Sequence, residues 1–156
     1  MRHKIITFIL VILVLGVIIS VTSEENTSNS VYNSIPIDEF KIQCNYIPYD
    51  ITYNDIAREP DKYKGVKIEF EGKVAQVQES GSDVILRVNI TPEEYGIYKD
   101  TIWVNYTNSS DKRKILEDDI VDIWGVLNGT KTYTAILGNK ITIPKVDTRS
   151  IEILYN

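Results

Sequence analysis

The stretch from Val66 to Val77 limits the fold most tightly, because its apolar side chains alternate with charged ones. Ile68 and Phe70 share one parity, and the positions on either side of them carry Lys67, Glu69 and Glu71. A period of two is typical of a β-strand with one buried face. After Gly72 the apolar positions move by one residue, to Ala75 and Val77, which indicates a bulge or a sharp bend. Long strands bent in this way serve two sheets of a small barrel.

The rest of the chain carries further strand patterns and few helical ones. Thr52 and Asp55 form a capping-box pair that predicts a short helix ended by Pro60. Residues 111–116 predict a short helix or a turn, and Asn128-Gly129 is a preferred pair for a hairpin turn. The expected later strands are 84–90, 101–106, 120–127, 130–137, 141–143 and a last, edge strand at 151–154.

Three strands, a short helix and a hairpin follow one another in the order of an OB-type barrel. We therefore predict an all-β fold with a small helical content, a five-stranded OB-fold-like barrel. A β-sandwich is the alternative. Trp124 and Tyr133 are expected in the core.

The N-terminal segment consists of the basic start Met1–Lys4 and an uncharged apolar run over residues 5–22. Its length fits either a signal peptide or an uncleaved membrane-spanning helix that leaves the remainder outside. The expected organisation is a signal peptide or anchor at 1–23, a polar linker at 24–48 and the barrel domain at 49–156. The predicted location is the cell membrane with the domain facing outside, or the secreted fraction.

Charge and residue content narrow the function. The chain has 17 Lys and Arg against 22 Asp and Glu, and without Arg2 and Lys4 the balance is 15 against 22, a net charge of −7. Such a charge makes nucleic acid an improbable partner. The one histidine is His3, so the exported part lacks Ser-His and Cys-His pairs and histidine metal sites. We predict no enzyme, no metal and no cofactor.

The outward face of the first three strands is the candidate ligand site, since OB barrels commonly bind there. Trp103 could stack on a sugar or a base, and Arg87 could form a bidentate contact with a carboxylate or phosphate. Parity places on this face Glu69, Glu71, Lys73, Arg87, Asn89, Trp103 and Asn105, of which Glu69, Lys73, Arg87, Trp103 and Asn105 are the predicted binding residues. The alternative is an ordinary polar face whose Trp is covered by a loop or by the N-terminal segment.

Five Asn-X-Ser/Thr sequons could carry glycans in an exported protein, at Asn26, Asn89, Asn105, Asn108 and Asn128. Glycans on Asn89 and Asn105 would cover the face proposed for a ligand. Glycosylation and ligand binding on that face are therefore competing predictions.

Short motifs in a fixed order resemble the exported tRNA-anti-like family of OB-fold domains. They are Asp55–Gly65, Phe70–Val74, Gln76-Val77, Ile115–Asp119, Gly125, Thr132-Tyr133 and Ile141–Pro144. Members occur behind membrane anchors in Gram-positive bacteria, their phages and some archaea, and some are labelled toxin-operon regulators. The resemblance spans about Tyr53 to Leu154, implies an OB barrel and supplies neither a ligand nor catalytic residues.

Two functions of different classes remain. The first is a membrane-tethered, non-enzymatic module that binds a protein or polysaccharide at the cell envelope, held to the membrane by residues 5–22. The second is a single-stranded nucleic-acid binder, whose affinity would fall steeply with salt.

Overall fold

The computed structural model describes residues 34–45, 50–108 and 112–155. The chain divides into two compact units, Met1–Ile35 and Pro36–Asn156, and the second contains the barrel. The predicted anchor or signal peptide at 1–23 and the sequon at Asn26 lie outside the described residues. In the described ranges, no helix has both the length and the apolar content needed to cross a bilayer.

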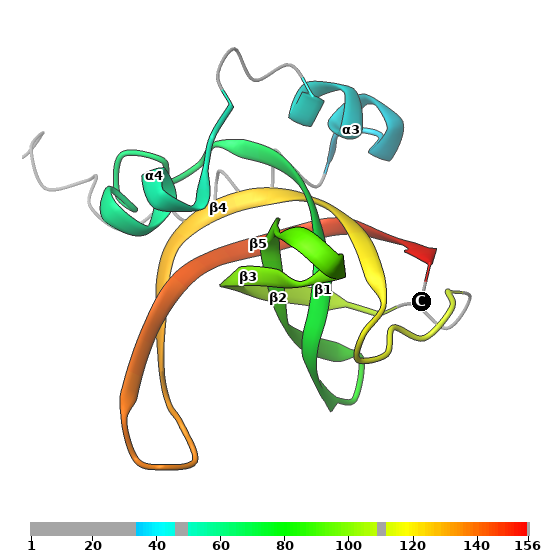
Figure 1. The fold of residues 1–156 in the computed structure, drawn as a ribbon. Helices are drawn as coiled ribbons and strands as arrows, with labels where there is room; N and C mark the ends of the chain where they lie inside the picture. The colour runs from blue at the N-terminus through cyan, green and yellow to red at the C-terminus, as the bar shows by residue number, and fades with distance from the viewer. Residues whose placement is uncertain (1–33, 46–49, 109–111, 156) are drawn as a thin grey trace, which may run out of the picture. The chain divides into compact units, whose positions relative to one another are not determined.

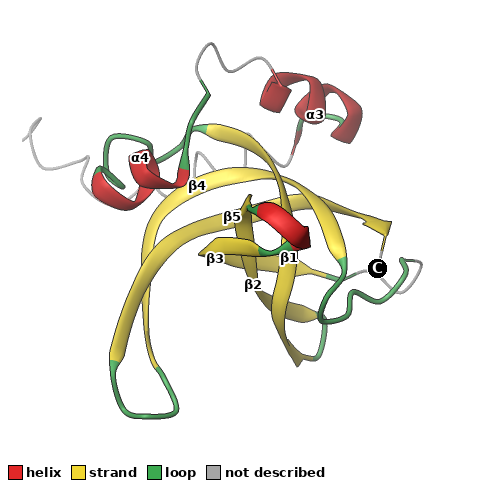
Figure 2. Cartoon of the chain, viewed as in Figure 1, coloured by secondary structure: helices red, strands yellow, loops and turns green. Residues whose placement is uncertain are grey.

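Five strands close into a barrel in the order β1-β2-β3-β5-β4 (Figures 1 and 2). Strands β3 and β5 are parallel, and every other neighbouring pair is antiparallel. This is the Greek-key barrel of the OB type, so the predicted all-β barrel class is confirmed and the sandwich alternative is wrong. The strands are β1 (Lys67–Ser80), β2 (Asp83–Pro92), β3 (Tyr98–Thr107), β4 (Ile120–Thr134) and β5 (Lys140–Tyr155).

The bend predicted in the first strand is present. The first half of β1 pairs with β4, the second half pairs with β2, and the register shifts between Val74 and Gln76. Gly72 lies where β1 passes between these neighbours, and a Cβ there would stand 2.6 Å from Val88 Cγ1. Ala75, expected among the apolar positions, is instead exposed as the bulge residue.

Inward-facing side chains of all five strands fill the barrel. The alternation predicted for 84–90 and 101–106 is confirmed, because Leu86, Val88, Ile102 and Val104 are fully buried. The expected edge strand at 151–154 is instead the end of β5, which continues through Pro144 and pairs with β4 as far as Tyr155. Because the barrel is closed, this segment is paired and is not the free edge strand that the sequence suggested.

Short segments connect the strands or pack against the barrel. Helix α4 (Tyr53–Arg58) begins with the predicted capping box, in which Asp55 N–H donates to Thr52 Oγ1 and Thr52 N–H donates to Asp55 Oδ2. Of the two alternatives for 111–116, the described part is not helical: the Leu116 N–H donates to Asp119 Oδ2 at 2.8 Å, and Ile115 packs into the core. A 3-10 turn, η1 (Glu94–Gly96), connects β2 to β3.

A helix that the sequence analysis missed lies in the expected linker 24–48. Helix α3 (Ile37–Asn45) buries Phe40 and Cys44, which are four residues apart and therefore share one face. It packs against β1 and β4. Two apolar side chains on one face of a polar nine-residue segment are a weak periodic signal, and tertiary contact stabilises the helix.

Candidate ligand-binding groove

The predicted face of β2 and β3 carries two of the candidate side chains directly opposite each other. Arg87 on β2 is the register partner of Trp103 on β3. Their neighbours along each strand point into the core, so Arg87 and Trp103 point to the outside of the barrel.

Hydrogen bonds fix the position of the Trp103 indole. Trp103 Nε1 donates to Asn105 Oδ1 at 2.9 Å, and Asn105 Nδ2 donates to Asp147 Oδ1, also at 2.9 Å. Asn128 Nδ2 donates to the other oxygen of Asp147, and Lys145 Nζ lies 3.2 Å from Asp147 Oδ1. Burial alone would raise the pKa of the Asp147 carboxyl, but these hydrogen bonds and the nearby ammonium outweigh burial and lower it.

The hairpin between β4 and β5 packs over the Trp103 side chain. The Tyr133 ring lies 5.7 Å from the Trp103 ring at an interplanar angle of 39°. Arg87 Cζ lies 4.7 Å from the centre of the Tyr133 ring, and Lys131 Nζ lies 5.6 Å from the centre of the Trp103 ring. Trp103 is consequently only 9% exposed, so it forms the floor of the site and Tyr133 and Arg87 form its accessible edge.

A cavity of about 150 Å³ opens between these elements. We call it the Arg87 groove; its lining residues are Gln76, Gln78, Ile85, Arg87, Trp103, Tyr133 and Thr134. It combines aromatic faces, side-chain amides and a guanidinium. Aromatic faces stack on flat rings, amides donate and accept hydrogen bonds, and a guanidinium pairs with an anion.

The structure separates the five predicted binding residues. Arg87, Trp103 and Asn105 lie together at the groove. Glu69 precedes the bend of β1, opposite Trp124 of β4, and lines a different cavity. Lys73 forms an ion pair with Asp118 at 3.0 Å.

Tyr133 and Lys131 were missed as groove residues. Tyr133 was expected in the core but is half-buried on the outer side of the hairpin. The hairpin turn predicted at Asn128-Gly129 is wrong, because β4 continues through these residues with a register shift and the turn lies between Thr134 and Lys140. The only sequence signal for Tyr133 was its place in this part of the chain, which many OB barrels use for binding. Trp124 is buried as expected, but on the outside of the barrel, where Lys41 of α3 lies 3.9 Å from its ring centre.

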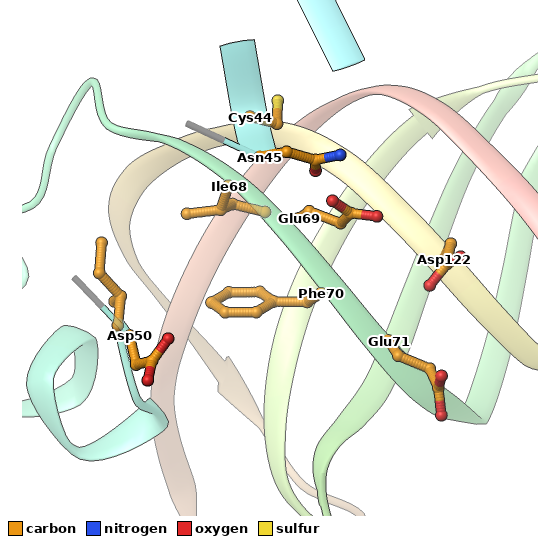
Figure 3. A pocket seen from close by; sticks show the side chains of 9 residues that line it. Cys44, Asn45, Asp50, Ile68, Glu69, Phe70, Glu71 and Asp122 are labelled. Carbon is orange, nitrogen blue, oxygen red and sulfur yellow. The ribbon is translucent and has the colours of Figure 1, made fainter. Parts of the chain in front are cut away.

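The second cavity, of about 600 Å³, lies beside α3 and is called the α3 cavity (Figure 3). Its lining residues are Cys44, Asn45, Asp50, Ile51, Ile68, Glu69, Phe70, Glu71 and Asp122. Burial and the nearby Asp122 raise the pKa of Glu69, against the effect of the Trp124 indole and Lys41. Burial, Glu71 and Glu152 likewise raise the pKa of Asp122. Nε1 of Trp124 is buried without a hydrogen-bond partner of good geometry.

Among the described residues of the α3 cavity, neither the Cys44 thiol nor the acidic side chains offer an activated nucleophile or a metal-binding cluster. Burial raises the pKa of the Cys44 thiol to about 11, so the nucleophilic thiolate is scarce near neutral pH. Within the described ranges, no three His, Cys, Asp or Glu side chains are placed to hold a metal ion.

Three of the four described sequon asparagines use their amide nitrogens inside the fold. Asn105 and Asn128 donate to Asp147, and Asn89 Nδ2 donates to the Tyr98 carbonyl oxygen at 3.3 Å. The fourth, Asn108, has a buried Oδ1 without a partner. Glycan attachment at Asn89, Asn105 or Asn128 would replace one hydrogen of a nitrogen that donates one of these hydrogen bonds.

Comparison with known proteins gives distant structural likeness. An OBody, AM3L09, solved bound to hen egg-white lysozyme, has a TM-score of 0.44 and 18% identity over 70% of this chain and 99% of that one. Aspartyl tRNA synthetase from Entamoeba histolytica has a TM-score of 0.44 and 17% identity over 78% of this chain and 23% of that one. Rim1, a mitochondrial single-stranded DNA-binding protein of S. cerevisiae, has a TM-score of 0.34 and 15% identity over 59% of this chain and 97% of that one.

Neither a family model nor a curated protein matches the chain. The likeness to solved structures is too distant to indicate a function. The assignment of the fold therefore rests on the strand order of the barrel itself.

Proposed function

We propose that this chain is a non-enzymatic binding module that residues 5–22 tether to a membrane, with the OB barrel outside the cytoplasm. Its ligand is an acidic polysaccharide of the cell envelope, bound in the Arg87 groove. The observation that carries the proposal is the contact of Arg87 with Tyr133 above Trp103, because it places a guanidinium beside an aromatic face.

A polysaccharide fits the groove better than the alternatives. Sugar rings stack on aromatic side chains, and the amides of Gln76 and Gln78 can hydrogen-bond to their hydroxyl groups. Arg87 can pair with a carboxylate or phosphate on the polymer. The volume of about 150 Å³ suits one ring rather than a run of stacked bases.

Single-stranded nucleic acid is the second candidate. The observation in its favour is that two cations, Arg87 and Lys131, lie over the two aromatic rings. Binding to single strands normally needs a positively charged track with several stacking platforms. The Arg87 groove offers two cations and a volume suited to one ring rather than such a track, which is why we rank this function second.

Binding of the full chain in detergent to polygalacturonate, neutral dextran and oligo-dT tests the proposal. We expect binding to polygalacturonate and at least a tenfold loss, about 1.4 kcal/mol, for Arg87→Ala and for Tyr133→Ala. Arg113→Ala and Tyr95→Ala remove an exposed Arg and an exposed Tyr outside the groove and should leave binding unchanged.

Two outcomes would overturn the ligand assignment. Binding to oligo-dT alone, with a steep salt dependence, would favour the nucleic-acid function. Equal binding by the groove variants and the controls would remove the groove as the site. N-terminal sequencing of the chain from the membrane fraction tests the tether separately, and a native chain found in the cytosol with residues 1–23 intact would contradict it.

A further inference from the structure

The tip of the β4–β5 hairpin exposes two adjacent aliphatic side chains. The strands pair as far as Thr134 and Lys140, and Ala135 N–H then donates to the Asn139 carbonyl oxygen at 2.8 Å. Gly138, at a φ of 84°, allows the tight turn. Ile136 is fully exposed and Leu137 is 89% exposed.

This hairpin projects away from the rest of the barrel, as its orange loop in Figure 1 shows. Single exposed apolar residues are common on protein surfaces and need no explanation. Here, however, two neighbours occupy the end of a projecting, hydrogen-bonded arm. An apolar tip held in this way is suited to enter another apolar phase.

The charge of the hairpin is opposite to that of the chain. Between Asp122 and Asp147 the sequence has no acidic residue but contains Lys131, Lys140 and Lys145, whereas the whole chain carries −5. Lys145 lies at the base of the hairpin, where it pairs with Asp147. Lys140 lies near the tip and is exposed. The projecting part is thus basic, and it complements an anionic surface.

The spacing of Lys140 and the tip matches the depth of a membrane interface. Lys140 pairs with Thr134, which is two residues before Ile136, so Lys140 lies within about 7 Å of the tip along the hairpin. Apolar side chains that bind at the interface enter it by about 5–10 Å, the depth of the boundary between headgroups and acyl chains. Insertion of the tip would therefore leave the Lys140 ammonium at the level of the lipid phosphates.

We infer that Ile136 and Leu137 insert into the anionic surface of a lipid bilayer, with Lys140 contacting the headgroups. This contact orients the barrel on the membrane and does not depend on which ligand occupies the Arg87 groove. An acidic barrel would otherwise be repelled by such a surface, so the basic hairpin is the part that faces the lipid.

The test places an environment-sensitive nitrobenzoxadiazole probe on the tip of the full chain. Ile136→Cys accepts the probe, since Cys44 is buried. The labelled chain is reconstituted into vesicles of phosphatidylcholine alone or mixed with phosphatidylglycerol. We expect a blue-shifted emission, quenched by doxyl-labelled lipid, and a larger shift in the mixed vesicles.

Matched variants distinguish membrane contact by the hairpin from attachment through the N-terminal segment, because all of them keep that segment. The same probe at Tyr95→Cys, on the exposed β2–β3 connection, should keep the emission of a water-exposed site. Lys140→Glu combined with the tip probe should remove most of the difference between the two lipid mixtures. A probe at Leu137→Cys should repeat the result obtained at Ile136→Cys.

Two results would overturn the inference. One is a tip probe that keeps the emission of water in both kinds of vesicle. The other is a shift that grows with the protein-to-lipid ratio and ignores lipid charge. The second result would mean that the tip contacts another copy of the chain.

Discussion

The Arg87 groove and the α3 cavity occupy two outer faces of the same barrel, yet their chemistry differs. At the groove, Asp147 accepts hydrogen bonds from Asn105 and Asn128, and its pKa is lowered. In the α3 cavity, Glu69 and Asp122 lie close to each other and both pKa values are raised. A charged side chain on the outer face of a strand is therefore stabilised or destabilised according to the segment that covers it.

The covering segments differ in the same way. A hairpin of the barrel itself closes the groove and brings the cations Arg87 and Lys131 over aromatic rings. Helix α3 covers the other face, and its Lys41 contacts Trp124 and pairs with Glu152. The hairpin continues two barrel strands, whereas α3 precedes the barrel domain and is held by Phe40 and Cys44.

The largest effect is expected where α3 is attached. Phe40→Ala removes a fully buried ring that lies 4.8 Å from the Arg149 guanidinium. We expect the packing of α3 against the barrel to lose about 3 kcal/mol of stability. We expect α3 to open locally once this anchor is lost, so the modification rate of the Cys44 thiol should rise up to about 100-fold at fixed pH. Ile42→Ala, on the exposed side of α3, is the control. An unchanged thiol rate would show that α3 does not depend on Phe40.

A smaller loss of stability is expected in β1, whose residues line both the Arg87 groove and the α3 cavity. In Gly72→Ala the new Cβ would lie 2.6 Å from Val88 Cγ1 and 2.7 Å from the Asn89 carbonyl oxygen. We expect a loss of about 2 kcal/mol in the free energy of unfolding, measured with urea. Ala75→Ser, at the exposed bulge, should change it little. A stable Gly72→Ala variant would mean that β1 shifts without loss of packing.

A smaller loss is expected for Asp147→Asn at the groove. The new amide would meet the amide donors of Asn105 and Asn128, and we expect a loss of about 1 kcal/mol at pH 7. A lowered pKa means that the stabilisation is complete above the ordinary value of 3.8 and disappears as the pH falls through the folded-state value. Urea unfolding at neutral and acidic pH should therefore show a difference that narrows in acid. A difference independent of pH would contradict this account.

The smallest change, of opposite sign, is expected for Asp122→Asn in the α3 cavity. A raised pKa means that the charged carboxylate destabilises the fold above the folded-state pKa, and that this cost disappears below the ordinary value of 3.8. The variant should gain about 0.5 kcal/mol at neutral pH, a small value because solvent screens a half-exposed group. Asp61→Asn, at an exposed turn, is the control. A loss of stability at pH 7 would show that Lys41 outweighs burial.

The sequence predicted the barrel because its strands obey local rules. The alternation before Gly72, the slip after it and the Thr52–Asp55 capping box all appear in the structure. Only some of the predicted binding residues lie close together in the structure. Alternation predicts that a side chain faces outward, but it does not predict which part of the barrel surface a bent strand gives it. Glu69 therefore lies beside α3, whereas Arg87 and Trp103 lie at the groove.

Alternation and local motifs were enough to indicate most strand positions, the bend of β1 and an apolar N-terminal segment followed by an acidic, histidine-free remainder. Contacts between distant segments were needed to show that α3 forms and covers one outer face, and that Tyr133 lies over Trp103 beside the groove on another. The two kinds of feature depend on interactions of different range along the chain. Periodicity and helix caps depend on a few neighbouring residues. The packing of α3 on an outer face of the barrel depends instead on contacts between residues far apart in the sequence, such as the ion pair of Lys41 with Glu152.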